Sequence, residues 1–357
     1  MSNTARARFA CANTSARIID TSGSTLKRWI AISLIATTGL VLLGAGLIGY
    51  AYRWMHTPLS TTQNTIIELR HGEAFAGFVA RLHVDGIVDE PRILTWTARV
   101  LGQARRAQAG EYLIDEGTTG AELLQLLVRG RVIGYTVQII EGWTVMRAVD
   151  ALVGNDVLRS ELKGVNEASL LAALGLPDGR AEGLFFPDTY RFVRGDSDAD
   201  VLRRAYTKMR DELQRAWHAR ADGLPYQSAY QALVVASLIE KETGREEDRI
   251  HISQVFATRL HLGMYLQTDP SVIYGLGERY DGNLTRKHLR EDTPYNTYFH
   301  KGLPPTPIAL PGVNSITAAM NPGSGVYLYF VAQGDGGSQF SVSLEDHLTA
   351  VRKYQLR

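Results

Sequence analysis

The residues best placed to do chemistry stand at the end of an apolar segment, in the run Glu240-Lys241-Glu242. Residues 228 to 243 have apolar side chains on nearly every face of a predicted helix, so we expect this helix to be buried. The helix dipole and burial both disfavour an ionised acid in its last turn. A carboxyl group that stays neutral can donate a proton to a leaving oxygen, as cleavage of a glycosidic bond requires. Glu240 is therefore the candidate catalytic acid.

A second interpretation of the same helix end involves no chemistry. Glu240, Lys241 and Glu242 would then exchange ion pairs in solvent, and the residues alone do not decide between the two interpretations. Ordinary glycosidases use two acids at a defined separation, so a second acid is also of interest. Four carboxylates could supply it: Glu182, Asp188, Glu242 and Asp269. Of these we expect Glu182 in a cleft, whereas Asp188 and Asp269, each next to a proline, have the character of turn residues.

Other common catalytic mechanisms lack the residues that they need. The sequence has no His-Glu-x-x-His motif, no P-loop and no Gly-x-Ser-x-Gly motif, and its nine histidines are scattered without ligand spacing. We therefore expect no metal and no cofactor. A net charge of +1 also argues against a dedicated nucleic-acid-binding protein. Carboxylate chemistry remains.

A membrane anchor is expected at residues 29 to 52, because this stretch has no charged side chain and is longer than the roughly 30 Å core of a bilayer requires. Residues 1 to 28 carry five basic side chains and one acidic one, which predicts a cytoplasmic tail and a periplasmic remainder at the inner membrane. A cleaved signal peptide would have a shorter apolar region. The single cysteine, Cys11, lies in this tail, so the exported part has no disulfide.

The elements that must position the acid begin after a polar spacer at residues 53 to 64. Periodicity predicts a small unit of strand, two helices and strand, and Thr119 with Glu122 predicts the capped start of one more helix, which completes a subdomain at residues 65 to 131. The predicted elements of the small unit are a strand at 66 to 69, helices at 75 to 84 and 93 to 107, and a strand at 112 to 114. At Glu141 to Thr144 the chain repeats the strand, glycine turn and helix arrangement found around Gly72.

The larger domain, residues 132 to 357, is expected to be α+β as well. A strand at 132 to 140 opens it, and residues 263 to 322 are rich in loops and prolines, a composition that is typical of a binding cleft. Its predicted helices lie at 198 to 220, 228 to 243 and 246 to 262, and a hairpin with a helix capped by Ser343 ends the chain.

Five ordered blocks of the sequence resemble the endolytic murein transglycosylases of the MltG (YceG-like) family. The blocks are Glu-Gly-Leu-Phe-Phe-Pro-Asp-Thr-Tyr at 182 to 190, Ala-Ser-Leu-Ile-Glu-Lys-Glu-Thr at 236 to 243, Gly-Met-Tyr-Leu-Gln-Thr-Asp-Pro-Ser-Val-Ile-Tyr-Gly at 263 to 275, Pro-Tyr-Asn-Thr-Tyr at 294 to 298, and Gly-Leu-Pro-Pro followed by Pro-Ile at 302 to 308. The resemblance implies one transmembrane helix, a LysM-like βααβ subdomain and a larger catalytic domain.

The same resemblance implies a reaction. The family's catalytic glutamate falls on Glu240, and the implied activity is that of a lytic transglycosylase, a carbon-oxygen lyase acting on a polysaccharide. It would cleave the β-1,4 bond between N-acetylmuramic acid and N-acetylglucosamine in nascent peptidoglycan, leave a 1,6-anhydro end and terminate strand elongation. Because the sugar's own 6-hydroxyl replaces water, one residue can act as acid and then as base. Penicillin-binding synthases are the implied partners.

Four residues in the matched blocks are candidates for substrate binding, namely Glu182, Gln267, Tyr295 and Asn296. Their polar groups suit sugar hydroxyls and N-acetyl amides, and Tyr295 can also stack; an equally good role for the last three is to hold their own loops. Phe185, Phe186 and Tyr190 are expected in the core. The alternative function, from another class, is a non-catalytic membrane-anchored scaffold that only binds peptidoglycan.

Overall fold

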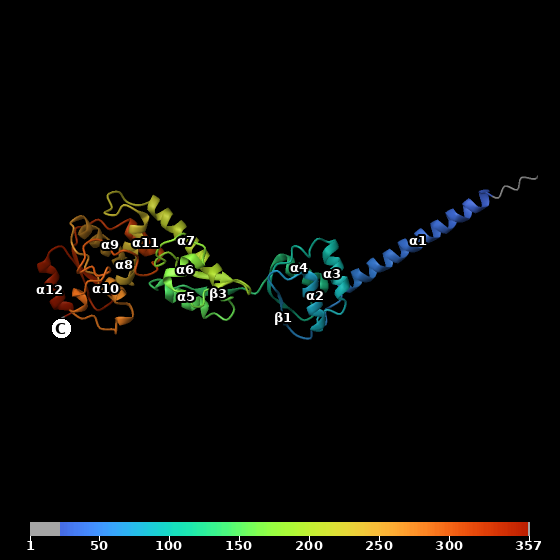
Figure 1. Cartoon of the computed structure of the whole chain (residues 1–357), viewed down its shortest axis with the longest axis horizontal. Coiled ribbons are helices and arrows are strands. Elements are labelled where there is room, and N and C mark those ends of the chain that lie inside the picture. Colours follow the sequence, from blue (N-terminus) through green and yellow to red (C-terminus); the bar gives the residue numbers. More distant parts are fainter. Residues whose placement is uncertain (1–21, 356–357) are drawn as a thin grey trace, which may run out of the picture. The chain divides into compact units, whose positions relative to one another are not determined.

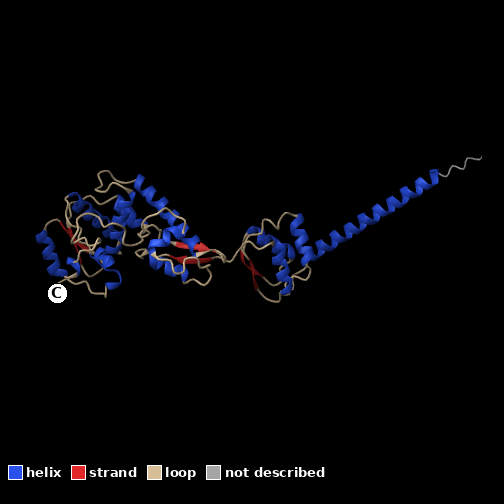
Figure 2. Cartoon of the chain, in the orientation of Figure 1, coloured by secondary structure: helices blue, strands red, loops and turns tan. Residues whose placement is uncertain are grey.

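The computed structural model describes residues 22–355 and confirms the mixed α+β class (Figures 1 and 2). Most of the predicted cytoplasmic tail, including Cys11, lies outside the described residues. The chain divides into two compact units. The first comprises the described residues up to Thr65 with Ala74–Ala107 and Ile114–Arg129, and the second comprises Ile66–Glu73, Gln108–Leu113 and the described residues from Gly130 onward.

The chain's longest helix, α1 (Ser22–Met55), contains the predicted membrane segment. Within the described residues it is the one helix long and apolar enough to cross a membrane, with a mean hydropathy of 2.2 over an 18-residue window of Lys27–Met55. The helix runs three residues past the predicted boundary. Residues 56 to 64 then pack within the first unit, where the backbone N–H of Leu59 donates to the Thr118 carbonyl at 2.8 Å.

Three short helices form the rest of the first unit, namely α2 (Phe75–Val84), α3 (Pro91–Val100) and α4 (Gly120–Arg129). The capping box is confirmed, because Thr119 N–H donates to Glu122 at 2.9 Å and Glu122 N–H donates to the Thr119 hydroxyl at 3.3 Å. Helix α3 ends at Val100 and not at 107 as predicted, because Gly102 turns the chain with a φ of +67°. Strands β1 (Thr65–Leu69) and β2 (Gly110–Ile114) pair with each other, so the predicted βααβ order is present.

The second unit repeats that order. Strand β3 (Tyr135–Gln138) is followed by α5 (Val145–Val153), α6 (Glu167–Ala173) and β4 (Thr189–Phe192), and the two strands pair antiparallel. The repetition expected at Gly72 and Gly142 is confirmed, because both glycines adopt a φ of +76° in the turn between a strand and a helix. Strand β3 is shorter than the predicted strand at 132 to 140.

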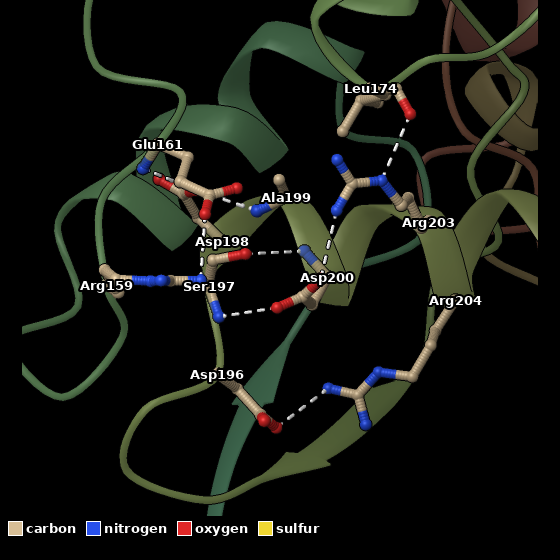
Figure 3. Close-up of polar contacts among 10 residues, drawn as sticks. All are labelled: Arg159, Glu161, Leu174, Asp196, Ser197, Asp198, Ala199, Asp200, Arg203 and Arg204. Atoms are coloured by element: carbon tan, nitrogen blue, oxygen red, sulfur yellow. Dashed lines mark hydrogen bonds and ion pairs between the residues drawn. The ribbon is translucent and has the colours of Figure 1, made fainter. Parts of the chain in front are cut away.

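A dense polar cluster fixes the start of α7 (Asp198–His218), as Figure 3 shows. Ser197 and Asp200 cap the helix reciprocally at 3.0 and 3.1 Å. The carboxylate of Asp198 is buried and accepts hydrogen bonds from the backbone N–H groups of Glu161 at 2.9 Å and Leu162 at 3.2 Å. These bonds satisfy the buried charge and hold the loop after α5 against α7.

The core around the candidate acid is built from α8 (Ala229–Glu242), α9 (Glu246–His261) and α11 (Val313–Met320), which pack against one another. The middle of α8 is buried from Ala232 to Ile239, as its sequence predicts. Helix α8 ends at Glu242 because the next residue, Thr243, has an extended backbone.

The stretch at 263 to 322 contains more regular structure than the loop-rich prediction allowed. It includes two helices, α10 (Asp269–Leu276) and α11, and two 3-10 turns, Gly277–Arg279 and His288–Arg290. Asp269 begins α10 and does not form a turn, since a proline in the first helical turn is compatible with a helix. The hairpin of β5 (Tyr329–Ala332) and β6 (Ser338–Ser341) and the Ser343 cap of α12 (Leu344–Tyr354) are confirmed.

Candidate active site

The carboxylate of Glu240 lies in the last turn of α8 and contacts two other helices. Its Oε2 accepts a hydrogen bond from the backbone N–H of Gly312 at 3.0 Å and another from the Ser315 hydroxyl at 2.7 Å. Its Oε1 lies 3.7 Å from Nη2 of Arg249, and only 7% of the Glu240 side chain is exposed. The N-terminus of α11 and the first turns of α9 therefore position the candidate acid.

Two hydrogen-bond donors, the N-terminus of α11 and the Arg249 guanidinium surround the Glu240 carboxylate. Glu240, Lys241 and Glu242 do not pair with one another in solvent, which the second interpretation of the sequence expected. Lys241 donates to the Gly142 carbonyl at 3.2 Å, and Glu242 accepts from the Thr268 hydroxyl.

A second carboxylate, that of Glu141, lies beside the first. Glu141 belongs to the turn between β3 and α5, and the pKa of its carboxyl is raised by partial desolvation and by the neighbouring charge of Glu240, with Arg249 opposing the shift. Sequence reasoning missed this residue. The repeated glycine turn at 141 to 144 was the signal that could have found it, although that signal alone pointed only to a fold.

A cavity of about 830 Å³ opens in the second unit, next to the end of α8. Among the residues that line it are Thr144, Glu182, Lys241, Tyr274, Tyr295 and Ile308. The cavity thus brings together two of the predicted substrate-binding residues, Glu182 and Tyr295. Glu240 is adjacent through Lys241 and does not line the cavity itself.

Glu182 is a buried acid at the wall of this cavity, with 1% of the residue exposed. Its Oε1 accepts from the backbone N–H of Val145 at 3.0 Å, and its Oε2 accepts from the Tyr274 hydroxyl at 3.3 Å. Burial raises the pKa of Glu182 to about 8, because these bonds only partly offset the loss of hydration. Glu182 can therefore present a protonated carboxyl group near neutral pH.

The other three predicted substrate-binding residues lie in different surroundings. Tyr295 lines the cavity, packs edge-on against Tyr274 with the ring centroids 4.9 Å apart, and shares a 2.9 Å hydrogen bond with Thr306. Gln267 is exposed with a φ of +53°, and its side-chain oxygen lies 3.5 Å from Arg259. The structure does not place Gln267 in the cavity lining.

Asn296 is fully buried inside its own loop. Its amide nitrogen donates to the carbonyls of His288 at 3.2 Å and Glu291 at 2.7 Å, and its oxygen accepts from the backbone N–H of Tyr298 at 2.9 Å. All of its hydrogen bonds therefore hold the loop that carries Tyr295. The side chain does not reach the cavity.

The residues expected to be structural are confirmed as such. Phe185, Phe186 and Tyr190 are buried. Asp188 pairs with Lys208 and accepts from the backbone N–H of Thr189 at 2.7 Å, and the hydrogen bond from Lys208 lowers the pKa of the Asp188 carboxyl. Asp188 is therefore engaged at the start of β4.

The chain is similar in sequence to several known proteins. A model of the YceG-like family matches residues 67–353. An endolytic murein transglycosylase of Bacillus subtilis (strain 168) is 28% identical over 335 residues, which span 88% of this chain and 91% of that protein. An endolytic murein transglycosylase of Streptococcus pneumoniae (strain D39) is 30% identical over 196 residues, which span 50% of this chain and 34% of that protein.

One solved structure of a YceG-like protein is also similar to this chain. The crystal structure of a YceG-like protein from Listeria monocytogenes is 27% identical, and the match covers 81% of this chain and 99% of that one with a TM-score of 0.49. The family model, however, spans most of the sequence and includes the whole of the candidate site. The chain therefore belongs to the YceG-like family.

Proposed function

We propose that this protein is an endolytic murein transglycosylase with Glu240 as its catalytic residue. The substrate is the β-1,4 bond between N-acetylmuramic acid and N-acetylglucosamine in nascent glycan strands, and the product is a 1,6-anhydro end that terminates elongation. Support comes from the relatives of that name and from the match of the family model across residues 67–353. The observation that carries the assignment is the Glu240 carboxylate, held by Gly312, Ser315 and Arg249 beside a cavity.

In the first step Glu240 gives its proton to the glycosidic oxygen, and the bond from that oxygen to C1 of the muramic acid breaks. The carboxylate that remains is stabilised by two donors and one guanidinium already in place, so the charge that develops is met without reorganisation. The 6-hydroxyl of the same sugar then bonds to C1, and its proton passes to Glu240. The residue is thereby restored, and no water is consumed.

The cavity supplies the binding surface in this proposal. The ring of Tyr295 and the buried carboxyl of Glu182 offer stacking and hydrogen bonding to an N-acetylated sugar. Asn296 and Gln267 then contribute by holding the loops around the cavity. A volume of about 830 Å³ is in the range of sites that enclose a small ligand.

A membrane anchor would determine where in the cell the enzyme acts. We propose that α1 is an uncleaved single-pass anchor in the inner membrane, with residues 1 to 28 cytoplasmic and the catalytic domain at 132 to 357 periplasmic. The βααβ segment at 65 to 131 is proposed as a LysM-like glycan-binding subdomain, and penicillin-binding synthases as partners. Such an anchor confines the active site to a shell near the membrane, where new strands are made.

The test is mass analysis of the fragments that the full-length protein in detergent releases from glycan strands. The expected products carry an anhydro end and are one water lighter than hydrolysed fragments. Glu240→Gln keeps the size of the side chain but cannot transfer the proton, so the cleavage rate should fall by at least about 100-fold.

The control is Glu247→Gln, which neutralises an acid that is 80% exposed on the next helix. It should cleave as the wild type does. If the products had the mass of hydrolysed fragments, the reaction would be hydrolysis and not transglycosylation. Binding of glycan by both forms without cleavage by either would establish the scaffold function instead.

A further inference from the structure

One side of helix α3 in the first unit is open to solvent although it carries an aromatic ring and two arginines. Four exposed residues follow one another along α3 at steps of three and four, and therefore share one side of the helix: Arg92, Trp96, Arg99 and Val100. We call these four residues the α3 face. Leu94 and Ala98 are buried on the opposite side of the helix, whereas 54% of Trp96 and 63% of Val100 are exposed.

The α3 face borders a hollow of about 450 Å³ between α2 and α3. The wall from α2 consists of two small residues, Ala76 and Ala80, which leave the hollow open. The wall from α3 includes the ring of Trp96 and the side chains of Arg92 and Arg99. An apolar ring and two guanidinium groups thus surround one shallow space at the surface.

The segment that carries the α3 face has an unbalanced positive charge. Residues 91 to 110 contain four arginines and no acidic residue. The four arginines are exposed, and none of them forms an ion pair with the residues that the structure describes: Arg92, Arg99, Arg105 and Arg106. The two acids just before α3 have other partners, since Asp89 accepts from the Ser60 hydroxyl at 2.7 Å and Glu90 accepts from the Tyr50 hydroxyl at 3.4 Å. The segment is therefore suited to an anionic partner.

The contact between Glu90 and Tyr50 determines the depth at which α3 would meet a membrane. A helix crosses the roughly 30 Å hydrocarbon core with about 20 residues, so a span that starts at Trp29 leaves the core next to Tyr50. Helix α3 begins directly after Glu90 and packs against α1, as Figure 1 also shows. If α1 spans a bilayer, the start of α3 therefore lies at the level of the lipid headgroups.

We propose that the α3 face is a membrane-docking surface that binds the anionic phosphodiester headgroups of the bilayer that α1 spans. This inference rests on the proposed anchor. Guanidinium groups bind phosphate oxygens through two parallel hydrogen bonds, and tryptophan is enriched at the boundary between headgroups and hydrocarbon. An amphipathic helix with these residues lies in the plane of that boundary. Docking would hold the first unit against the membrane in addition to α1.

A glycan strand is the other partner that a tryptophan beside two arginines could bind. The depth of α3 favours lipid, because headgroups fill the space beside Tyr50 when α1 spans the bilayer. The charge favours lipid as well, since every phosphatidylglycerol headgroup carries a negative charge and many such groups lie side by side in one surface. The two partners give opposite results in the experiment below.

The test uses the full-length protein in lipid vesicles, with a fluorophore on Leu101→Cys and the natural cysteine removed by Cys11→Ser. Leu101 is 60% exposed at the end of α3 and is not part of the α3 face. A nitroxide attached to a lipid headgroup should quench this fluorophore in vesicles that contain phosphatidylglycerol, and less so in vesicles of phosphatidylcholine alone. The quenched fraction gives the ratio of docked to undocked protein.

The arginines should determine this ratio. Each arginine near an anionic surface contributes a factor of about five, so the double variant Arg92→Gln, Arg99→Gln should lower the ratio by about 25-fold. Trp96→Ala keeps the charge and should also lower it. The matched control is Arg210→Gln, because that exposed arginine already pairs with Asp211 at 2.8 Å. It should leave the quenching unchanged.

The outcomes separate docking from the anchor on which it rests. Retention of the protein on the vesicles through an alkaline wash reports on the anchor alone. Retained protein without quenching, or with equal quenching in the double variant and the wild type, would overturn docking and leave the anchor in place. Protein that washes off would overturn the anchor itself. A change in fluorophore emission on adding glycan strands, with no quenching by lipid, would make the α3 face a glycan-binding surface instead.

Discussion

Arg249 and Glu240 form a buried ion pair between α9 and α8, with Nη2 and Oε1 3.7 Å apart and 10% and 7% of the two side chains exposed. The arginine also acts through a hydroxyl, because its Nε donates to Ser315 Oγ at 3.1 Å and that hydroxyl donates to Glu240 Oε2 at 2.7 Å. Charge and hydrogen bonding therefore converge on one carboxylate. The catalytic proposal and the stability of this core depend on the same few atoms.

The ion pair predicts a strong coupling in stability. Arg249→Met leaves a buried carboxylate without its positive partner, so the free energy of unfolding should fall by about 3 to 5 kcal/mol near neutral pH. Adding Glu240→Gln removes the unpaired charge and should recover part of that loss. Denaturant unfolding of the wild type, both single variants and the double variant measures the coupling, and strictly additive losses would contradict it.

The Ser315 hydroxyl predicts an effect on rate. Ser315→Ala removes a hydrogen bond to the charge that develops on Glu240, worth about 1.5 to 3 kcal/mol, so kcat should fall by about 10- to 100-fold. Ser253→Ala is the matched control. The buried Ser253 hydroxyl donates at 2.6 Å to the carbonyl of Ala318, which lies on α11 as Ser315 does, but away from Glu240. This control should lower the melting temperature and leave kcat alone. Equal kcat values for the two variants would refute the role of Ser315.

Glu182 predicts a dependence of stability on pH. Its folded pKa is about 8, whereas an unfolded glutamate titrates near about 4.3, so between these values the folded chain keeps a proton that the unfolded chain releases. The free energy of unfolding should therefore fall as pH rises through this window. In Glu182→Gln the melting temperature should fall less between about pH 5 and pH 8.

Glu242, whose pKa burial raises to about 7, contributes in the same direction in both proteins, so some decline should remain in the variant. The exposed control Glu247→Gln should follow the wild type. An identical decline in Glu182→Gln and the wild type would show that the Glu182 carboxyl is not held protonated in the folded protein.

Alanine substitutions at two glycines with almost the same φ should lower the free energy of unfolding by different amounts. A Cβ at Gly183, with φ +82°, would lie 2.4 Å from the ring atoms of Pro307, whereas a Cβ at Gly164, with φ +80°, has nothing within 4 Å. Gly164→Ala should cost only backbone strain, about 1 kcal/mol. Gly183→Ala adds a steric clash and should cost at least about 3 kcal/mol. Thermal unfolding measures the loss of stability in each variant. Equal losses would mean that Pro307 moves away from the added methyl group at no cost in free energy.

Local features of the chain could be predicted because their causes are local. The long apolar helix α1 follows from an uninterrupted apolar run, the starts of α4 and α12 from capping residues, and the buried course of α8 from its apolar faces. The ends of elements were predicted less well. Helix α3 ends early at a positive-φ glycine, and α10 and α11 form where prolines had suggested loop.

The amino-acid sequence by itself determined the α+β order, the repeated βααβ pattern and the blocks that relate the chain to the YceG-like family. Only the tertiary structure decided the surroundings of Glu240, because Gly312 and Ser315 are 72 and 75 positions away from it along the chain. Periodicity and capping report on neighbours within a few turns of backbone. The charge state of a carboxylate depends instead on the dipoles, donors and charges that packing brings to it, and these arrive from helices that no local pattern connects.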